Sequence, residues 1–128
     1  AKQQVGLDVS FRAPYDLSSY QYYFVKMSST DDYITVCSAG ADNSVGVLQN
    51  KPDTAGAEAL VRCLGHSKIV ASGDLDVSNT IGPDTSGKAQ AVSMAAGQTD
   101  TIMGVMTVGT SNDGEIGEML IMPVVSNI

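Results

Sequence analysis

Short apolar runs separated by turn-forming residues dominate this sequence and limit the folds open to it. Three such runs lie between Ser44 and Gly73, namely Val45–Leu48, Ala57–Leu64 and Ile69–Ala71. The intervening residues, Asn50–Gly56 and Gly65–Lys68, predict two turns. Runs of this length with this punctuation are typical of antiparallel strands and not of helices.

The same pattern continues through most of the chain. Further strands are expected over Gln21–Met27, Tyr33–Ala39, Leu75–Gly82, Lys88–Met94, Thr101–Val108 and Glu115–Val125. Asn112–Gly114 predicts a hairpin turn between the last two, because Asp-Gly tolerates positive φ. Eight or nine short strands predict an all-β fold, a small single-domain β-barrel or sandwich with one core, over residues 21–128.

Two of the expected strands carry predictions about which side chains face the core. In the first, Tyr22 and Phe24 are expected to point inward, and Tyr23 and Val25 to point away. In the last, Met119 and Met122 fall on opposite faces. Only one of these methionines can then lie in a single core, and the other could serve as an adaptable contact between subunits.

Residues 1–20 differ from the rest. They show no sustained period of 2 or 3.6, and Pro14 holds the preceding residue extended. We therefore predict an extended N-terminal arm over residues 1–20. All seven aromatic residues, five Tyr and two Phe, lie before residue 34.

This aromatic cluster has two interpretations. It closes one end of the β domain, since aromatic side chains bury large areas wherever they lie. Alternatively, the arm contacts a partner, because tyrosine supplies contact area at a low entropic cost. On the second interpretation the partner-binding residues are Phe11, Arg12, Pro14, Tyr15 and Tyr20.

Charge and hydropathy exclude several classes of partner. Fourteen acidic residues against seven basic ones give a net charge of -7, which repels a phosphate backbone. We expect no direct nucleic-acid binding. No run approaches the roughly 18 apolar residues of a membrane helix, and the first ten residues lack a signal-peptide core. Ala1 would suit removal of an initiator Met, so synthesis in a cytoplasm is expected.

Motifs that resemble catalytic or cofactor sites are incomplete. Gly82–Lys88 fits the G-x-x-x-x-G-K pattern, but Ala89 replaces the hydroxyl that would bind magnesium. His66 is the only histidine and falls in an expected turn, so a solvated turn residue is favoured. We predict no catalytic residue and no cofactor, and thus no enzyme.

No complete metal site is present either. Asp74–Thr85 resembles a calcium loop but lacks the required Gly and Glu, which leaves only a weak surface site at Asp74, Asp76 and Asp84. Cys37 and Cys63 are expected to be free buried thiols, although one disulfide between them is possible. We therefore predict no bound metal.

Several turn-and-strand motifs resemble the capsid decoration, or cement, proteins of tailed bacteriophages. They are Gly46–Pro52, Gly56–Glu58, Val61–Gly65, Lys68–Val70 and Gly82–Ala89, with Gly114–Ile121 similar to the family's final strand. The resemblance covers about residues 44 to 92 together with this final strand.

The resemblance implies a compact β domain on the outer surface of an assembled phage head. The expected partner is the major capsid protein, the expected oligomer is a homotrimer, and the expected location is the virion after synthesis in the host cytoplasm. The expected function is capsid stabilisation. A tail, baseplate or fibre domain shares the same composition. A small carbohydrate-binding module is a further alternative, with Tyr20, Tyr22 and Tyr33 as its aromatic platform.

Overall fold

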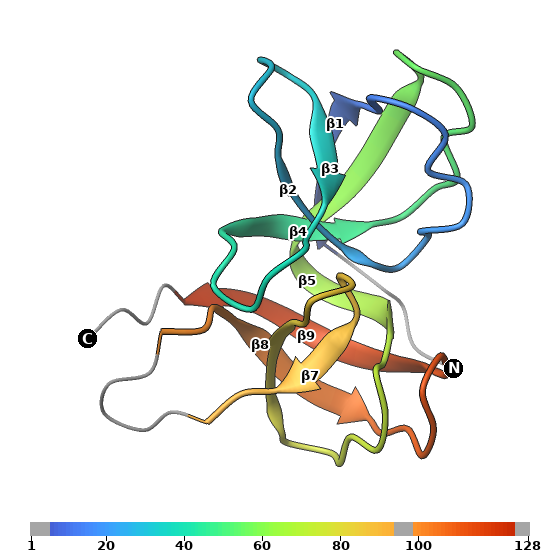
Figure 1. The fold of residues 1–128 in the computed structure, drawn as a ribbon. Coiled ribbons are helices and arrows are strands. Elements are labelled where there is room, and N and C mark those ends of the chain that lie inside the picture. Colours follow the sequence, from blue (N-terminus) through green and yellow to red (C-terminus); the bar gives the residue numbers. More distant parts are fainter. Residues whose placement is uncertain (1–5, 94–98, 125–128) are drawn as a thin grey trace.

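The computed structural model describes residues 6–93 and 99–124, and these form nine β-strands and no helix (Figure 1). The strands are β1 Gly6–Arg12, β2 Phe24–Met27, β3 Ile34–Val36, β4 Ser44–Leu48, β5 Glu58–Val70, β6 Thr80–Pro83, β7 Ala89–Ala91, β8 Ile102–Val108 and β9 Ile116–Val124. The predicted all-β fold is confirmed.

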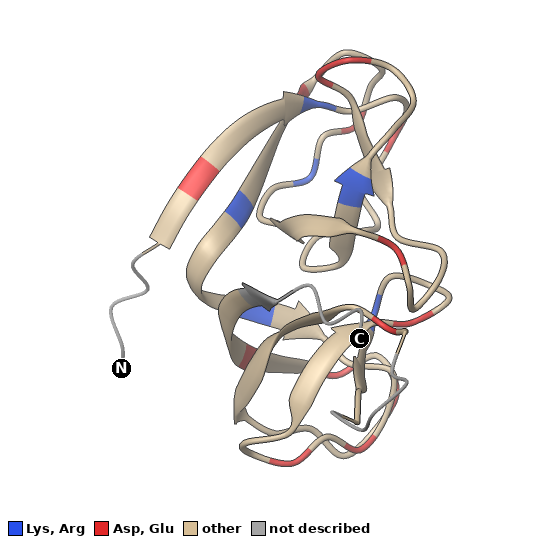
Figure 2. Ribbon diagram, turned by 90° about the vertical axis from the view of Figure 1, so that its left-hand side faces the viewer, with Lys and Arg blue, Asp and Glu red and all other residues tan. Residues whose placement is uncertain are grey.

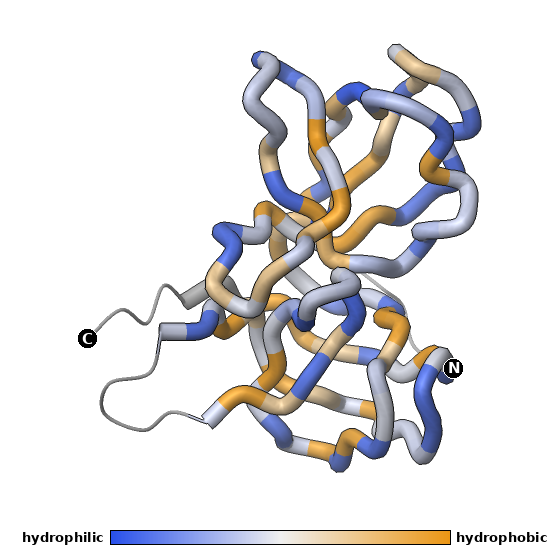
Figure 3. Tube along the Cα trace, in the orientation of Figure 1, coloured by the Kyte–Doolittle hydropathy of each residue, from blue (hydrophilic) through white to orange (hydrophobic). Residues whose placement is uncertain are grey.

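The strands belong to one curled antiparallel sheet. Their order is β3-β2-β4-β5-β9-β8-β6-β7, and β1 pairs separately with β5. Figure 1 shows an upper lobe that contains β1 to β4 and a lower lobe that contains β6 to β9. Strand β5 runs through both lobes and connects them. Hydrophobic residues concentrate along the strands, and the loops are mostly hydrophilic (Figure 3).

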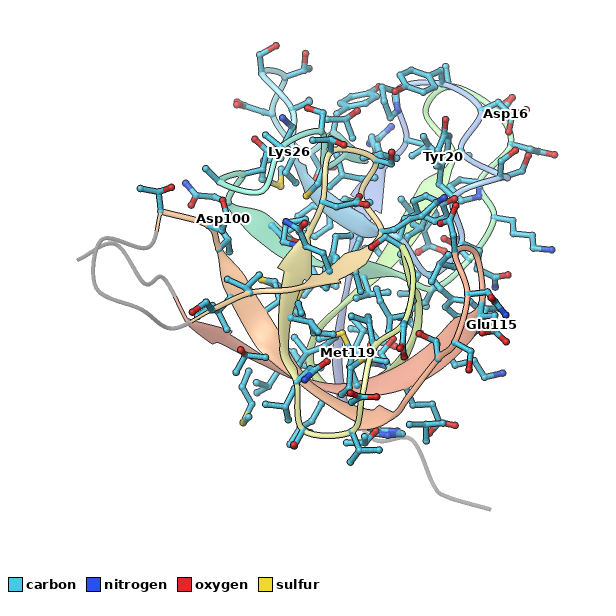
Figure 4. All side chains as sticks on the ribbon, turned by 60° about the horizontal axis from the view of Figure 1, so that its bottom comes forward. Asp16, Tyr20, Lys26, Asp100, Glu115 and Met119 are labelled. Carbon is cyan, nitrogen blue, oxygen red and sulfur yellow. The ribbon has the colours of Figure 1, made fainter. Side chains whose placement is uncertain are left out.

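Two hydrophobic cores are present instead of the single one expected. The upper core consists of Ala13, Leu17, Val25, Ile34, Leu48, Ala59 and Val61. The lower core consists of Phe24, Cys37, Val47, Ile69, Ala71, Leu75, Ile81, Ala89, Met103, Met106, Met119 and Ile121. Met119 lies inside the lower lobe in Figure 4. Strands β2 and β4 contribute to both cores.

The prediction for the first strand is therefore wrong in part. Strand β2 begins at Phe24, and Tyr22 precedes it with a positive φ of 68°. Val25 was expected to face away from the core, but it is as fully buried as Phe24. Both faces of β2 are covered, because one packs on the lower core and the other on the upper core.

The turn predicted at Gly65–Lys68 is also wrong. These residues lie inside β5, which continues without interruption for 13 residues. Gly65 takes a φ of 108°, and strand pairing passes from β1 on one side of this point to β9 on the other. The inward and outward alternation persists through it, since Ser67 and Ile69 are buried and Leu64 and Lys68 are exposed.

The N-terminal segment differs from the predicted arm over residues 1–20. Residues 6–12 form β1, which pairs antiparallel with β5 from Gly65 to Glu58. Ala13 and Leu17 are fully buried in the upper core. Residues 1–5 of the predicted arm lie outside the described residues. The segment 6–20 is extended in part, but it is built into the domain.

The C-terminal hairpin follows the prediction. Strands β8 and β9 pair antiparallel, with Val105 opposite Leu120 and Met106 opposite Met119. The connection contains Asn112–Gly114, where Gly114 has a φ of 89°. The predicted Asp-Gly turn is thus confirmed.

Close approach of β4 to β5 requires a glycine. A Cβ atom at Gly46 would lie 2.1 Å from the carbonyl oxygen of Arg62, and its φ is 151°. No side chain fits at that distance, so β4 crosses β5 in near backbone contact.

Candidate interaction surfaces

The partner-binding residues predicted from the sequence lie in different environments. Phe11 and Tyr20 are half-buried and pack against the upper core. Tyr20 also makes an edge-to-face contact with Tyr23, with ring centroids 5.2 Å apart. The rings of Phe11 and Tyr20 therefore contribute to the packing of the domain. Figure 4 shows Tyr20 and Lys26 on separate parts of the upper lobe.

Pro14 and Tyr15 line an open groove of about 710 Å³ beside the β2–β3 hairpin. Its remaining lining residues are Lys26, Met27, Ser28, Ser29, Thr30, Tyr33 and Thr35. The hairpin is tied to the end of β1, because the N–H of Arg12 donates to the carbonyl of Asp32 at 2.8 Å. This bond positions Pro14 and Tyr15 against the hairpin.

The polar groups of the groove have defined partners. The Tyr15 hydroxyl lies 3.3 Å from Oγ1 of Thr35. The Lys26 ammonium lies 3.0 Å from the Asp42 carboxylate, which also accepts hydrogen bonds from the backbone N–H groups of Ser38 and Ala39. Burial disfavours the Asp42 charge, but these three donors outweigh it and hold the pKa of the carboxyl below its usual value. The groove therefore offers aromatic surface and hydroxyl groups. Its cation, Lys26, is neutralised by Asp42.

A smaller hollow of about 320 Å³ contains the other predicted residues, Phe11 and Arg12, together with Ser10, Asp32, Gly56 and Glu58. Arg12 is exposed and lies 3.4 Å from Asp32. Ser10 donates to Glu58 at 2.7 Å. Since Asp32 neighbours Tyr33, the hollow adjoins the groove. Of the predicted residues only Tyr20 lies elsewhere.

Sequence reasoning missed Tyr33 and Thr35 as groove residues, although Ser28–Asp32 is a continuous polar segment.

The aromatic platform considered for a carbohydrate-binding module does not form as expected. Tyr20 packs against the upper core, whereas Tyr22 packs against the lower core. The Lys68 ammonium lies 5.8 Å from the centre of the Tyr22 ring. Only Tyr33 of the three lines the groove, and Tyr15 accompanies it there.

His66 is not the solvated turn residue that was predicted. It lies in β5 with its side chain 14% exposed. Its Nε2 is 3.0 Å from Oγ1 of Thr107 and 3.3 Å from a carboxylate oxygen of Glu118. Its Nδ1 is buried and makes no hydrogen bond within the described residues. The imidazole thus bridges three strands across the outside of the sheet.

Exposed apolar side chains gather on that outer side of β1, β5 and β9. They are Leu7, Leu64, Ile116, Leu120 and Met122, each between 36% and 57% exposed. Met119 is fully buried, so Met119 and Met122 lie on opposite faces as predicted.

The segment that matched the phosphate-loop pattern is a tight turn between β6 and β7. The Asp84 carboxylate accepts hydrogen bonds from the N–H groups of Ser86 at 2.8 Å and Lys88 at 2.9 Å. A carboxylate occupies the position that a phosphate would need, and β7 follows where a helix would be required. This segment does not fit a nucleotide.

Cys37 and Cys63 are free thiols, the first buried and the second half-buried. Burial raises the pKa of the Cys37 thiol to about 12. In the parts of the chain that the structure describes, no three His, Cys, Asp or Glu residues are grouped to hold a metal ion. Over residues 6–93 and 99–124 no helix is both long and apolar enough for a membrane span.

No family model matches the sequence, and no curated protein matches it. Among solved structures, the fold is similar to the N base of the head fiber gp8.5 in bacteriophage phi29, with a TM-score of 0.69 and 16% sequence identity. The similarity covers 95% of this chain and 97% of that chain. Nearly the whole of this domain therefore shares its fold with a head fiber base.

Proposed function

We propose that this chain is a non-enzymatic structural protein of a bacteriophage head. The observation that carries the proposal is the fold similarity to a head fiber base, which extends over almost the full length of both chains. The sequence supports it independently, through decoration-protein motifs that include Gly46–Pro52.

The finer proposal is a decoration role. The domain binds the major capsid protein on the outer surface of the assembled head, as a homotrimer, after synthesis in the host cytoplasm. Binding that favours the assembled state stabilises it by mass action. On the upper lobe, Arg12, Pro14 and Tyr15 are the predicted partner-binding residues that remain accessible beside the hairpin groove and its adjoining hollow. We assign the shell contact to them.

A fibre base is an equally good alternative, because the similar structure is part of a head fiber. The two roles differ in what they do to the shell. We expect a decoration protein to raise the temperature at which the head comes apart, and a fibre base to attach to the head without raising it.

The test mixes the purified protein with heads that lack it and, separately, with unassembled capsid subunits. We expect binding to heads only, together with a higher disruption temperature. Tyr15→Ser should weaken binding, and Val77→Ser, an exposed apolar residue of the lower lobe, should not. Absence of binding to heads would contradict the head role. Binding without thermal stabilisation would favour the fibre base.

The groove supports a second candidate function, the binding of a neutral saccharide. Tyr15 and Tyr33 line it together with hydroxyls of Ser28, Thr30 and Thr35. Aromatic faces stack on sugar rings, and its volume lies within the usual range for small-ligand sites. A glycan array should give signals that Tyr15→Ala removes. An array without signals would eliminate this candidate.

A further inference from the structure

Strand register places a set of side chains from three strands on one side of the sheet. Leu7 of β1 pairs with Leu64 of β5, and His66 of β5 pairs with Leu120 of β9. Farther along, Lys68 pairs with Glu118 and Val70 with Ile116. Directly paired residues point to the same side of a sheet. Val70 is buried, at 8% exposed. We define the outer face as a set of exposed and half-buried residues on this side, namely Leu7, Asp8, Arg62, Leu64, His66, Lys68, Ile116, Glu118, Leu120 and Met122.

The apolar members of the outer face are only partly covered by the described residues. Leu64 is 51% exposed and Ile116 is 54% exposed, whereas Met119 and Ile121 on the opposite side of β9 are fully buried. Strand β9 is thus apolar on both sides, although only one side packs on a core. Exposed apolar clusters of this kind mark interaction sites.

Two charged groups of the outer face, Arg62 and Asp8, are already paired with each other. Arg62 donates to both carboxylate oxygens of Asp8, at 2.7 and 3.0 Å, and to the carbonyl of His66 at 2.9 Å. Glu118 lies 3.3 Å from His66. A partner that covers Arg62 and Asp8 does not leave either charge unpaired, which would be the main cost of burying them.

Net charge distinguishes this face from the rest of the molecule. The outer face holds two acids, Asp8 and Glu118, and two bases, Arg62 and Lys68, so its formal charge is zero. The remaining acids and bases therefore carry the whole net charge of -7. Most Asp and Glu positions lie in loops (Figure 2). Two copies that meet through other surfaces repel each other, but this repulsion is weakest through the outer face.

We infer that the outer face is the surface through which one copy of this chain contacts another. A strongly acidic or basic partner would find no net charge to match there, whereas a second outer face presents the same apolar residues, the same Arg62–Asp8 pair and no net charge. The inference deepens the proposed head-associated role, in which several copies act together, but its test needs no heads.

The experiment measures the molar mass of the whole chain by size-exclusion chromatography with light scattering over a range of concentrations. We expect a multiple of the 13.3 kDa chain mass for the unaltered protein and the mass of one chain for Leu64→Asp. Val77→Asp is the matched control, since Val77 is 61% exposed but lies off the outer face, and it should keep the unaltered mass. Leu120→Asp is a second variant in case Leu64→Asp unfolds.

The inference is overturned if the unaltered protein has the mass of one chain at every concentration. It is also overturned if the folded outer-face variants keep the multiple mass. A single-chain protein that still binds heads would refute the contact between copies and leave the head role intact. A multimer that does not bind heads would support the contact between copies and contradict the head role.

Discussion

Phe24 and Val25 are neighbours in the chain, and both are fully buried, but they belong to different cores. Val47 and Leu48 on the adjacent strand β4 repeat this arrangement. Strands β2 and β4 therefore form a shared wall between the two lobes. A destabilising substitution in one core is therefore expected to destabilise the other core as well.

The shared wall predicts one cooperative unfolding transition. Ile34→Ala in the upper core and Ile81→Ala in the lower core each remove a fully buried isoleucine. Each should lower the free energy of unfolding by roughly 2–5 kcal/mol. In both variants fluorescence and circular dichroism should report one transition. Two separate transitions, with only one displaced by each substitution, would show that the cores are independent.

Gly46→Ala should destabilise the protein strongly. The new Cβ would lie 2.1 Å from the carbonyl oxygen of Arg62, in a backbone conformation that alanine rarely adopts. We expect a loss of about 3 kcal/mol in urea denaturation. Gly73→Ala is the control, because a Cβ there meets nothing within 4 Å. An equal effect of both substitutions would contradict the close approach of β4 to β5.

Substitutions in β1 can distinguish a built-in strand from a free arm. Phe11 packs against the upper core, whereas its neighbour Arg12 is exposed. Phe11→Ala should cost about 2 kcal/mol in thermal or chemical denaturation. Arg12→Ala should change stability by less than about 0.5 kcal/mol. If Phe11→Ala also leaves stability unchanged, the segment is a passive arm.

The Asp42 carboxylate should contribute stability that depends on pH. Its pKa is lowered in the folded state, so the contribution is complete above the unfolded pKa of about 3.9 and disappears as pH falls through the lower folded value. Asp42→Asn should cost about 1 kcal/mol at pH 7 and almost nothing at pH 2. Asp113→Asn, at an exposed ion pair with Lys88, should have little effect at either pH. A pH-independent effect of Asp42→Asn would rule out this linkage.

The Cys37 thiol should make the free energy of unfolding depend on pH in alkaline solution. Its pKa of about 12 lies above the unfolded value, so the unfolded chain loses the proton first as pH rises above about 9. Stability then falls by up to about 1.4 kcal/mol per pH unit, and this component should be missing in Cys37→Ala. Thiol reagents at pH 8 should also leave Cys37 unmodified until the protein unfolds. Rapid modification at Cys37 itself in the folded protein, distinguished from the half-buried Cys63 by peptide mapping, would contradict the burial of Cys37.

The sequence pattern was sufficient where local signals agreed. The β8–β9 hairpin combines two apolar runs with an Asp-Gly turn, and both strands and the turn agree with the prediction. Opposite faces for Met119 and Met122 followed from strand periodicity alone. These features depend on residues that are close together in the chain, so the local sequence pattern is enough to predict them.

Features that depend on distant parts of the chain were not predicted. Gly65 looked like the start of a turn, but pairing with β1 and β9 keeps it within a strand. Leu7, Val9 and Phe11 do alternate with polar residues, and this weak signal for β1 was outweighed by the irregular segment after it. The candidate groove combines Tyr15 with Tyr33, which only tertiary structure brings together.

Strand β5 determines how the molecule responds to a mechanical load. It passes from one lobe to the other as a single strand of 13 residues, with hydrogen-bonded neighbours in both lobes. A pull along the direction of this strand would act in shear on the ladders with β1, β4 and β9. Shear must break many hydrogen bonds together, whereas peeling breaks them singly. A load along β5 is therefore expected to meet resistance from both lobes together.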